Sequence, residues 1–229
     1  MFHAVTTRHG ASGKPFAWSY SKLKNFETCP KRHYHIDIIK EYKDGGEAMD
    51  WGMAVHKTLA QRIKDGTALP PLHTSHERWA KWVEEMPGDI VLVEQQMAVD
   101  ERHDPCEWFG RKAWFRAVAD VIKINGPVAV VVDWKTGKII EDSAQLALTA
   151  AVMFQHYPQL QRIRLCFVWL QDNAKTIATL SREEGRQVWD YLSDRVETMK
   201  IAHERTEYPP TPNRYCRFCP VKKCPHNGG

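Results

Sequence analysis

The stretch that most constrains the fold of this chain is a pair of apolar segments joined by a tight turn. The first, RKAWFRAVADVIKIN (residues 111–125), alternates apolar and polar side chains, as a half-buried strand does. An N-G-P turn follows, and the next segment, GPVAVVVDWKTGK (126–138), carries the aliphatic run of a buried strand. Two strands joined by such a turn form an antiparallel hairpin, so we expect a sheet at the centre of this protein.

The segments around the hairpin predict helices on both sides of it. Ser19 or Ser21 can cap the first helix, Leu23 and Phe26 form its apolar stripe, and Pro30 is expected to stop it. The helices are expected over 18–30, 46–66, 75–86, 143–157 and 182–204, and further strands over 89–100, 163–172 and 174–181. This order predicts an α/β or α+β chain with a small mixed sheet.

Length and charge leave several classes of function open. The chain has 229 residues, enough for one large domain or for one domain with an appendage. No apolar run approaches the ~20 residues of a membrane span, and MFHAVTTRHGASGK lacks the apolar stretch of a secretory signal. We therefore expect a cytoplasmic protein without a membrane partner. A net charge of +4 permits a polyanionic partner but does not require one.

The second hairpin strand ends in an acid and a lysine that share one face. Side chains alternate along a strand, so Asp133 and Lys135 point to the same side. Asp120 ends the alternating stretch 113–120, so the hairpin can bring two carboxylates together. With the backbone carbonyl of Trp134, they would offer the oxygen ligands that Mg²⁺ or Mn²⁺ prefers. The alternative is a solvated ion pair at a strand end.

Four motifs in order resemble the PD-(D/E)XK nuclease superfamily. They are GMAVH on a helix, AD at 119–120, VVDWKTGK, and QLALTA on the next helix. The resemblance spans about residues 19–226, and it is closest to the RecB/AddB-type exonucleases and the related CRISPR-adaptation nucleases. It implies a restriction-endonuclease-like core with a central mixed sheet flanked by helices. We expect a single nuclease domain over 1–229, with its core at about 47–180.

The resemblance also implies roles for individual residues. Asp120 and Asp133 would be metal ligands, and Lys135 would be the catalytic lysine that attends the attacking water or the phosphate. His56 matches the helix histidine of the family, which serves the metal site or contacts phosphate. Gln145 matches the glutamine that positions the lysine or the DNA. A histidine on the apolar face of a helix is otherwise a packing residue, which is the alternative for His56.

Two further positions are less clear from the sequence. The family often has tyrosine where this chain has Thr149, so a stacking or phosphate contact there is in doubt. Glu94, in VLVEQQ, offers either a further acid for the site or an exposed strand residue.

The six cysteines fall into two groups. Cys106 and Cys166 are expected to be inert packing residues. Cysteines 216, 219 and 224 form C-x₂-C-x₄-C, and Cys29 ends the first predicted helix. Four thiolates suit an iron–sulfur cluster or zinc, and His226 could replace one of them in a zinc site.

The grouping of one early and three late cysteines resembles the iron–sulfur subset of the same family. That likeness implies a 4Fe–4S cluster held by Cys29, Cys216, Cys219 and Cys224, with Zn²⁺ as the alternative. The cluster would tie segment 19–32 to segment 212–226. Basic side chains would then gather on one face and guide a DNA backbone, unless they form two solvated charge runs; they are Lys22, Lys24, Lys31, Arg32, Arg214, Arg217, Lys222 and Lys223.

The expected activity is that of a Mg²⁺- or Mn²⁺-dependent DNA exonuclease, acting in recombination, repair or phage DNA processing. The chain has no G-x-x-x-x-G-K-[ST] motif, so it would act alone or beside a recombination or replication protein. Its size fits a prokaryotic or phage-encoded enzyme, and the sequence leaves its oligomeric state open. The alternatives are a non-catalytic DNA-binding or assembly subunit of the same fold, and a DNA endonuclease.

Overall fold

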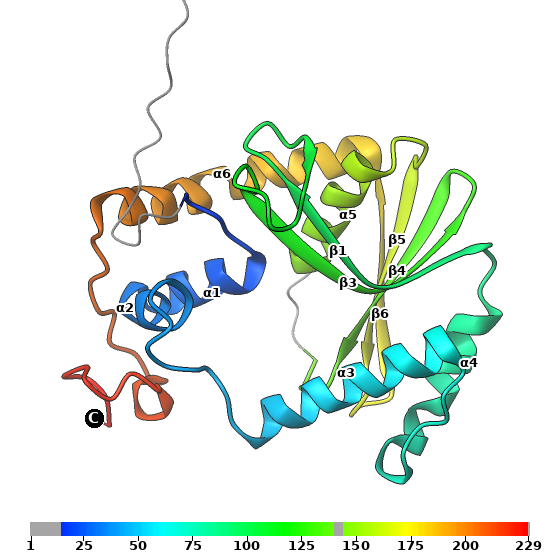
Figure 1. Ribbon diagram of the computed structural model, residues 1–229, viewed down its shortest axis with the longest axis horizontal. Coiled ribbons are helices and arrows are strands. Elements are labelled where there is room, and N and C mark those ends of the chain that lie inside the picture. Colours follow the sequence, from blue (N-terminus) through cyan, green and yellow to red (C-terminus); the bar gives the residue numbers. More distant parts are fainter. Residues whose placement is uncertain (1–14, 140–143, 229) are drawn as a thin grey trace, which may run out of the picture.

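The computed structural model describes residues 15–139 and 144–228 and is built around a six-stranded mixed sheet (Figure 1). The strand order is β2-β1-β3-β4-β5-β6. The strands are β1 (Ile90–Val99), β2 (Pro105–Cys106), β3 (Phe115–Asn125), β4 (Val128–Lys135), β5 (Arg162–Trp169) and β6 (Ala174–Ser181). In the part of the chain that is described, no helix is both long and apolar enough to cross a membrane.

Helices cover the sheet, and they lie before its first strand, within the β4–β5 connection and after its last strand. They are α1 (Tyr20–Thr28), α2 (Pro30–His33), α3 (Glu47–Asp65), α4 (Glu77–Glu85), α5 (Ala144–His156) and α6 (Arg182–Arg205). Shorter turns span Tyr34–Ile38, Pro71–His76 and Cys216–Phe218. The expected fold class is confirmed. Each predicted helix and long strand is present, with bounds within a few residues of those expected. Residue 143, where one helix was expected to begin, lies outside the described residues. The short β2 and α2 were missed.

The central hairpin forms as the sequence predicts. β3 and β4 pair antiparallel around a turn in which Gly126 has a φ of +56°, a conformation that glycine adopts without strain. β4 then pairs in parallel with β5, and α5 lies in the connection between them. A parallel pair needs such a crossover, which explains why a helix follows the strand that carries Asp133 and Lys135.

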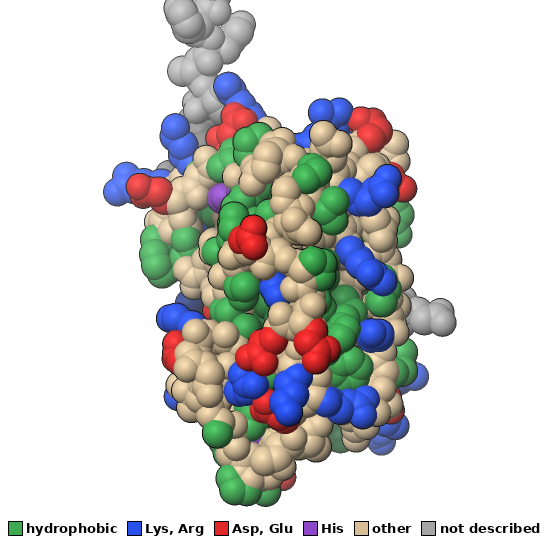
Figure 2. All heavy atoms as spheres, turned by 90° about the vertical axis from the view of Figure 1, so that its right-hand side faces the viewer, with side chains coloured by type: hydrophobic (Ala, Val, Ile, Leu, Met, Phe, Trp, Pro, Cys, Tyr) green, Lys and Arg blue, Asp and Glu red, His purple; other side chains and the backbone are tan. Residues whose placement is uncertain are grey.

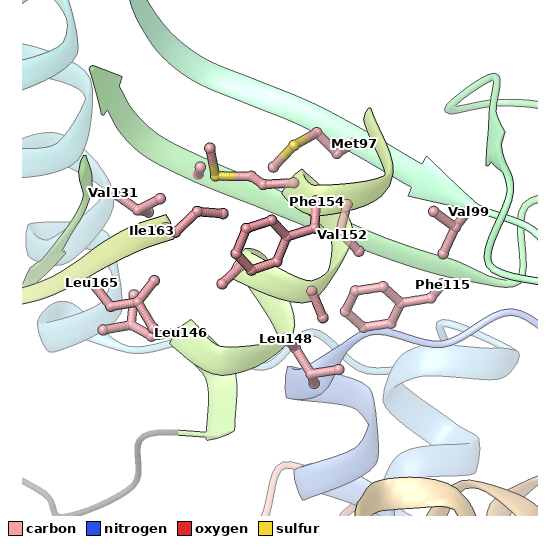
Figure 3. Packing of buried hydrophobic residues seen from close by; sticks show 14 of the residues in the cluster. Met97, Val99, Phe115, Val131, Leu146, Leu148, Val152, Phe154, Ile163 and Leu165 are labelled. Carbon is pink, nitrogen blue, oxygen red and sulfur yellow. The ribbon is translucent and has the colours of Figure 1, made fainter. Parts of the chain in front are cut away.

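The sheet is covered on both faces, by α5 and α6 on one side and by α3 and α4 on the other. Figure 3 shows Leu148, Val152 and Phe154 of α5 among side chains that come from β1, β3, β4 and β5. Because α5 lies between the sheet and α6, it is apolar nearly all round. On the other face, Arg62 of α3 holds Glu77 and Glu84 of α4 at 2.7 and 2.5 Å.

In both β1 and β3, the alternation of side chains between the two faces of the sheet changes at one pair of residues. The register places Glu94 opposite Asp120, but the ladder skips this pair, and Glu94 has a φ of +51°. Leu92 and Met97 of β1 contact the same core although they differ in parity along the strand. The sequence prediction that a strand ends at Asp120 was wrong. β3 continues to Asn125, and Asp120 lies at the irregular point within it.

The first helices also differ from expectation in one detail. Ser19 is the N-cap of α1 and accepts a hydrogen bond from the backbone N–H of Lys22 at 3.4 Å. α1 ends at Thr28, before Pro30, because Cys29 has an extended backbone. A proline disfavours the helical conformation of the residue before it, so Pro30 stops α1 as predicted. It also begins α2, where its missing N–H costs nothing.

The Cys-rich segments at the two ends of the chain lie side by side, with the C-terminal turns beside α1 and α2 (Figure 1). The Asn213 side chain donates a hydrogen bond to the carbonyl of Thr28 at 3.0 Å. On the face shown in Figure 2, basic and acidic side chains are interspersed, so the net positive charge is not gathered there.

Candidate active site

Three donor groups converge where the alternation of β1 and β3 changes. His56 comes from α3, Glu94 from β1 and Asp120 from β3. One ligand atom from each of them lies within 4.8 Å of the others. The Nδ1 atom of His56 lies 3.2 Å from Oδ1 of Asp120. Such a group of one imidazole and two carboxylates is suited to a divalent cation.

A second group lies next to the first and joins β4 to α5. Nζ of Lys135 donates a hydrogen bond to Oε1 of Gln145 at 2.8 Å, and Nε2 of Gln145 donates one to Oδ1 of Asp133 at 3.1 Å. Nζ of Lys135 also lies 2.8 Å from Oδ2 of Asp133. The three side chains therefore form a closed triangle, and Gln145 fixes both of the charged groups.

The backbone of β4 connects the two groups. The N–H of Trp134 donates a hydrogen bond to Oδ2 of Asp120 at 2.7 Å. Asp120 therefore contacts α3 through one oxygen and β4 through the other. This bond holds Asp120 beside the strand of Asp133 although the two acids are not a ladder pair.

Burial and neighbouring charges shift the protonation of three of these groups. Burial raises the pKa of Asp133 to about 6, against the lowering effect of Lys135. Burial also raises the pKa of Glu94, and the charge of Asp120 adds to this. For His56, burial opposes the charged ring, but the hydrogen bond and charge of Asp120 outweigh it, so the pKa of His56 is raised. The carboxylates thus repel one another while a cationic imidazole is favoured among them.

The donor set fits a divalent cation. Oδ2 of Asp133 is buried and has no partner with hydrogen-bond geometry, although Lys135 is close enough for an ion pair. An ionised oxygen without a hydrogen bond costs free energy unless a cation approaches it. Burial is the largest cause of the raised pKa values of Asp133 and Glu94, and the negative charge of Asp120 adds to both.

A groove of about 830 Å³ opens beside this site, and we call it the α3 groove. It is bounded by one side of α3 and by Val93, Glu94 and Thr136. Met49, Met53, His56 and Ala60 of α3 line it, and Met53 is 59% exposed. Val55 and Leu59 face the core instead, and Gly52 is buried but also lines the groove.

The family is decided by comparison with known sequences. A model described as the PD-(D/E)XK nuclease superfamily matches residues 17–224. This chain belongs to the PD-(D/E)XK superfamily. No curated protein matches the sequence. Membership agrees with the mixed sheet and with the acids on its strands.

Solved structures show the same fold at low sequence identity. The crystal structure of a "Putative exonuclease" from Eubacterium rectale has a TM-score of 0.57 and 13% identity, and the match covers 91% of this chain and 88% of that one. A second structure, SSO0001, has a TM-score of 0.49 and 14% identity over 98% of this chain and 89% of that one. Identities this low concern the fold alone.

In this PD-(D/E)XK chain, all the side chains singled out for the site from the sequence lie in the two groups above. Glu94 was expected to be either an acid of the site or an exposed strand residue, and it is both exposed and within the donor group. Glu94 lies opposite Asp120 because of the register in which β1 pairs with β3, and the sequence does not predict this register. The hydroxyl of Thr149 donates to the carbonyl of Gln145 in its own helix at 3.1 Å. The sequence analysis missed Thr136, which lines the α3 groove.

The four grouped cysteines line one small pocket together with His226. The N–H of Thr211 donates to Sγ of Cys29 at 3.4 Å, and the N–H of Asn213 donates to Sγ of Cys216 at 3.3 Å. Among the described residues, no three of the thiols come within 4.8 Å of one another. Cys166 is buried, and burial raises the pKa of its thiol to about 11, as suits a packing residue.

Several of the basic side chains near this pocket already contact carboxylates. Arg32 bonds Asp44, and Nζ of Lys223 lies 2.5 Å from Glu41. Lys24 lies 3.9 Å from Glu27, whose carboxylate is held more closely by Arg195 at 2.6 and 2.9 Å. These pairings reduce the net positive charge of the expected basic face.

Proposed function

We propose that this PD-(D/E)XK chain is a metal-dependent DNA exonuclease of the RecB/AddB type. The observation that carries the proposal is the donor group of His56, Glu94 and Asp120 beside the triangle of Asp133, Lys135 and Gln145. A structural relative described as a putative exonuclease agrees with it.

Asp120 and Asp133 would hold the Mg²⁺ or Mn²⁺ ion, with His56, Glu94 and the backbone carbonyl of Trp134 as further donors. Such an ion would neutralise the carboxylates and stabilise the charge that develops on the phosphate oxygens. Asp133 is suited to the role because its Oδ2 atom is buried and has only the ion pair with Lys135 as a described partner.

Lys135 would act on the phosphodiester as a fixed cation. Its ammonium group, held by Gln145 and Asp133, would donate a hydrogen bond to a phosphate oxygen or orient the attacking water. Gln145 is then a positioning residue, because it locks the lysine without needing to contact the DNA. The products would be 5′-phosphate and 3′-hydroxyl ends, as the family implies.

Degradation of linear DNA with Mg²⁺, Mn²⁺ or EDTA tests the proposal. We expect degradation only with a metal ion, its loss in Asp133→Ala, and a decrease of about 100-fold or more in Lys135→Met. Asp172→Ala, which removes an exposed acid in the β5–β6 turn, is the matched control and should retain full activity. Intact linear DNA with the wild-type protein would support the non-catalytic DNA-binding alternative.

A closed circular DNA separates the exonuclease from the endonuclease. An exonuclease leaves the circle whole and degrades the same DNA once it has been cut. Discrete fragments from the circle would contradict exonuclease action while leaving a nuclease role intact.

We also propose that Cys29, Cys216, Cys219 and Cys224 hold a 4Fe–4S cluster. Their shared pocket supports this, as do the backbone N–H groups directed at two of the sulfur atoms. Zinc is the alternative, because four thiolates, or three with His226, also suit a tetrahedral site.

Metal analysis of protein purified without oxygen tests the cluster. We expect a brown protein that contains iron and acid-labile sulfide in equal amounts. A colourless protein with stoichiometric zinc would overturn the iron assignment and favour the zinc alternative.

A further inference from the structure

A second groove reaches the candidate active site from the α5 side, opposite to the α3 groove. Its volume is about 620 Å³, and Gln145, which bonds Lys135 and Asp133, lies in its wall. The strand residues 116–118 form another part of the wall and lead along β3 to Asp120. The groove therefore reaches the candidate site at Gln145, and we call it the basic groove.

Among the described residues that line the basic groove, the charged side chains are all basic. Lys22, Lys24 and Arg116 are among its lining residues, and none of these lining residues is acidic. The hydroxyl side chains of Ser19 and Ser21 also face it. The α3 groove, by contrast, is of mixed charge, with Glu94 and Asp65 beside Lys57 and Lys64. A polyanion is therefore more favourable in the basic groove than in the α3 groove.

Aromatic side chains accompany these charges. Tyr20 and Trp108 line the groove and are half-buried. Nε of Arg116 donates a hydrogen bond to the carbonyl of Trp108 at 2.7 Å, and its guanidinium carbon lies 6.0 Å from the centre of the Trp108 ring. The next residue, Phe109, is 90% exposed. The β2–β3 connection thus presents aromatic rings beside a fixed cation.

We propose that the basic groove binds an unpaired DNA strand on its way to the active site. Trp108 stacks on a base, and Lys24 and Arg116 contact phosphates. Stacking needs a base face that is uncovered, and the bases of a duplex cover one another. The volume is that of a small-ligand pocket, roughly 300–1,000 Å³, so it fits a short piece of one strand. This inference rests on the proposed nuclease function and adds the form of DNA that the site receives.

Binding measured in EDTA tests the groove without DNA cleavage. Fluorescence anisotropy would compare a labelled oligo-dT strand with a blunt duplex of the same length. We expect Trp108→Ala to weaken strand binding about tenfold or more, since stacking contributes ~1–3 kcal/mol per base. Duplex binding should change far less. Tyr191→Ala, which removes an exposed ring from α6, is the matched control.

The salt dependence tests the phosphate contact. For a single strand, the slope of log K against log salt is about −0.7 for each phosphate contact. Lys24→Gln should make the slope less steep by about that amount. Arg186→Gln, on the exposed side of α6, should leave it unchanged.

Each result decides the proposal. Equal weakening for strand and duplex, or none in Trp108→Ala and Lys24→Gln, would overturn it. Tighter binding of an RNA strand of matching sequence would overturn the assignment to DNA. Failure of the nuclease proposal is distinguishable from failure of the groove proposal. Wild-type protein that binds the strand but leaves DNA intact with Mg²⁺ would contradict the nuclease activity and still support strand binding in the groove.

Discussion

At the scale of single residues, Asp133 shows how the site holds an unfavourable charge. The side chain of Asp133, on β4, is buried against α5. Its Oδ1 atom accepts a hydrogen bond from Gln145, and its Oδ2 atom has no partner with hydrogen-bond geometry. The raised pKa of Asp133, about 6, means that folding makes the ionised form less favourable than it is in the unfolded chain. Such destabilised groups are characteristic of functional sites rather than of cores.

Asp133→Asn should stabilise the metal-free protein at high pH. The pKa of Asp133 is about 6 in the folded protein against an ordinary value of 3.8, so folding binds a proton between these values. Stability is therefore lost as pH rises through this window, and the loss persists above it. In EDTA we expect a higher Tm for Asp133→Asn at pH 8 and little difference below pH 4.

The control for this experiment is Asp172→Asn, which changes an exposed carboxylate. Equal Tm values for Asp133→Asn and wild type at pH 8 in EDTA would mean that the Lys135 ion pair already compensates the buried charge. Adding Mg²⁺ should raise the Tm of the wild type and leave that of the variant nearly unchanged.

At the scale of elements, a lysine from the sheet caps the C-terminal end of α4. Nζ of Lys123, on β3, donates hydrogen bonds to the carbonyls of Val83 and Glu84 at 3.0 Å each, and to that of Met86. These are carbonyls that the end of a helix leaves without intrahelical partners. The bond fixes α4 against the same strand that carries Asp120, three residues earlier.

Lys123→Met should lower the free energy of unfolding by about 2–3 kcal/mol. The substitution keeps much of the buried volume but removes charged hydrogen bonds and leaves carbonyls unsatisfied. Urea denaturation would measure it, with Lys81→Met on the exposed side of α4 expected to stay within about 0.5 kcal/mol of wild type. A loss no larger than that of Lys81→Met would contradict this capping role.

The packing of α5 on α6 depends on Gly185. A Cβ there would lie 2.6 Å from Cδ2 of Phe154, whose ring is buried in the core (Figure 3). Gly185→Ala should therefore destabilise the protein by about 1–2 kcal/mol, although alanine favours the helix. Adding Gly185→Ala to Phe154→Leu should cost much less than adding it to wild type. Equal costs in the two backgrounds, measured in urea, would place the strain elsewhere.

At the scale of the whole molecule, the C-terminal segment 212–226 packs beside α1 and the residues that follow it (Figure 1). Asn213 reaches the carbonyl of Thr28, and Lys223 reaches Glu41, so polar contacts join two segments far apart in sequence. A metal cluster between Cys29 and the C-terminal cysteines would strengthen this connection by restricting the unfolded chain.

Cys29→Ser should lower the Tm and expose segment 212–226 to protease. The reason is that the cluster loses a thiolate that ties the two ends of the chain together. Cys106→Ser, on β2, is the matched control and should retain wild-type iron content and protease resistance. If Cys29→Ser kept its iron and resisted protease like Cys106→Ser, the clasp would be disproved.

Local chemistry in the sequence determined most of the elements. The N-G-P turn and the run VAVVV specify the β3–β4 hairpin by themselves, because turn geometry and alternation are properties of neighbouring residues. The same alternation places Asp133 and Lys135 on one face, and the structure joins them at 2.8 Å. The ordered motifs likewise indicated the family that the comparison shows.

Tertiary structure decided what those residues meet. Glu94 enters the donor group because β1 pairs with β3 in a register that leaves it opposite Asp120. Met49 and Met53 line a groove, while Val55 and Leu59 of the same helix enter the core, because the position of the sheet selects the buried face. Lys24 lines the same groove as Trp108 and Arg116 although it is distant from both in sequence. Pairing, burial and charge between distant segments depend on the whole packed chain, which no local pattern encodes.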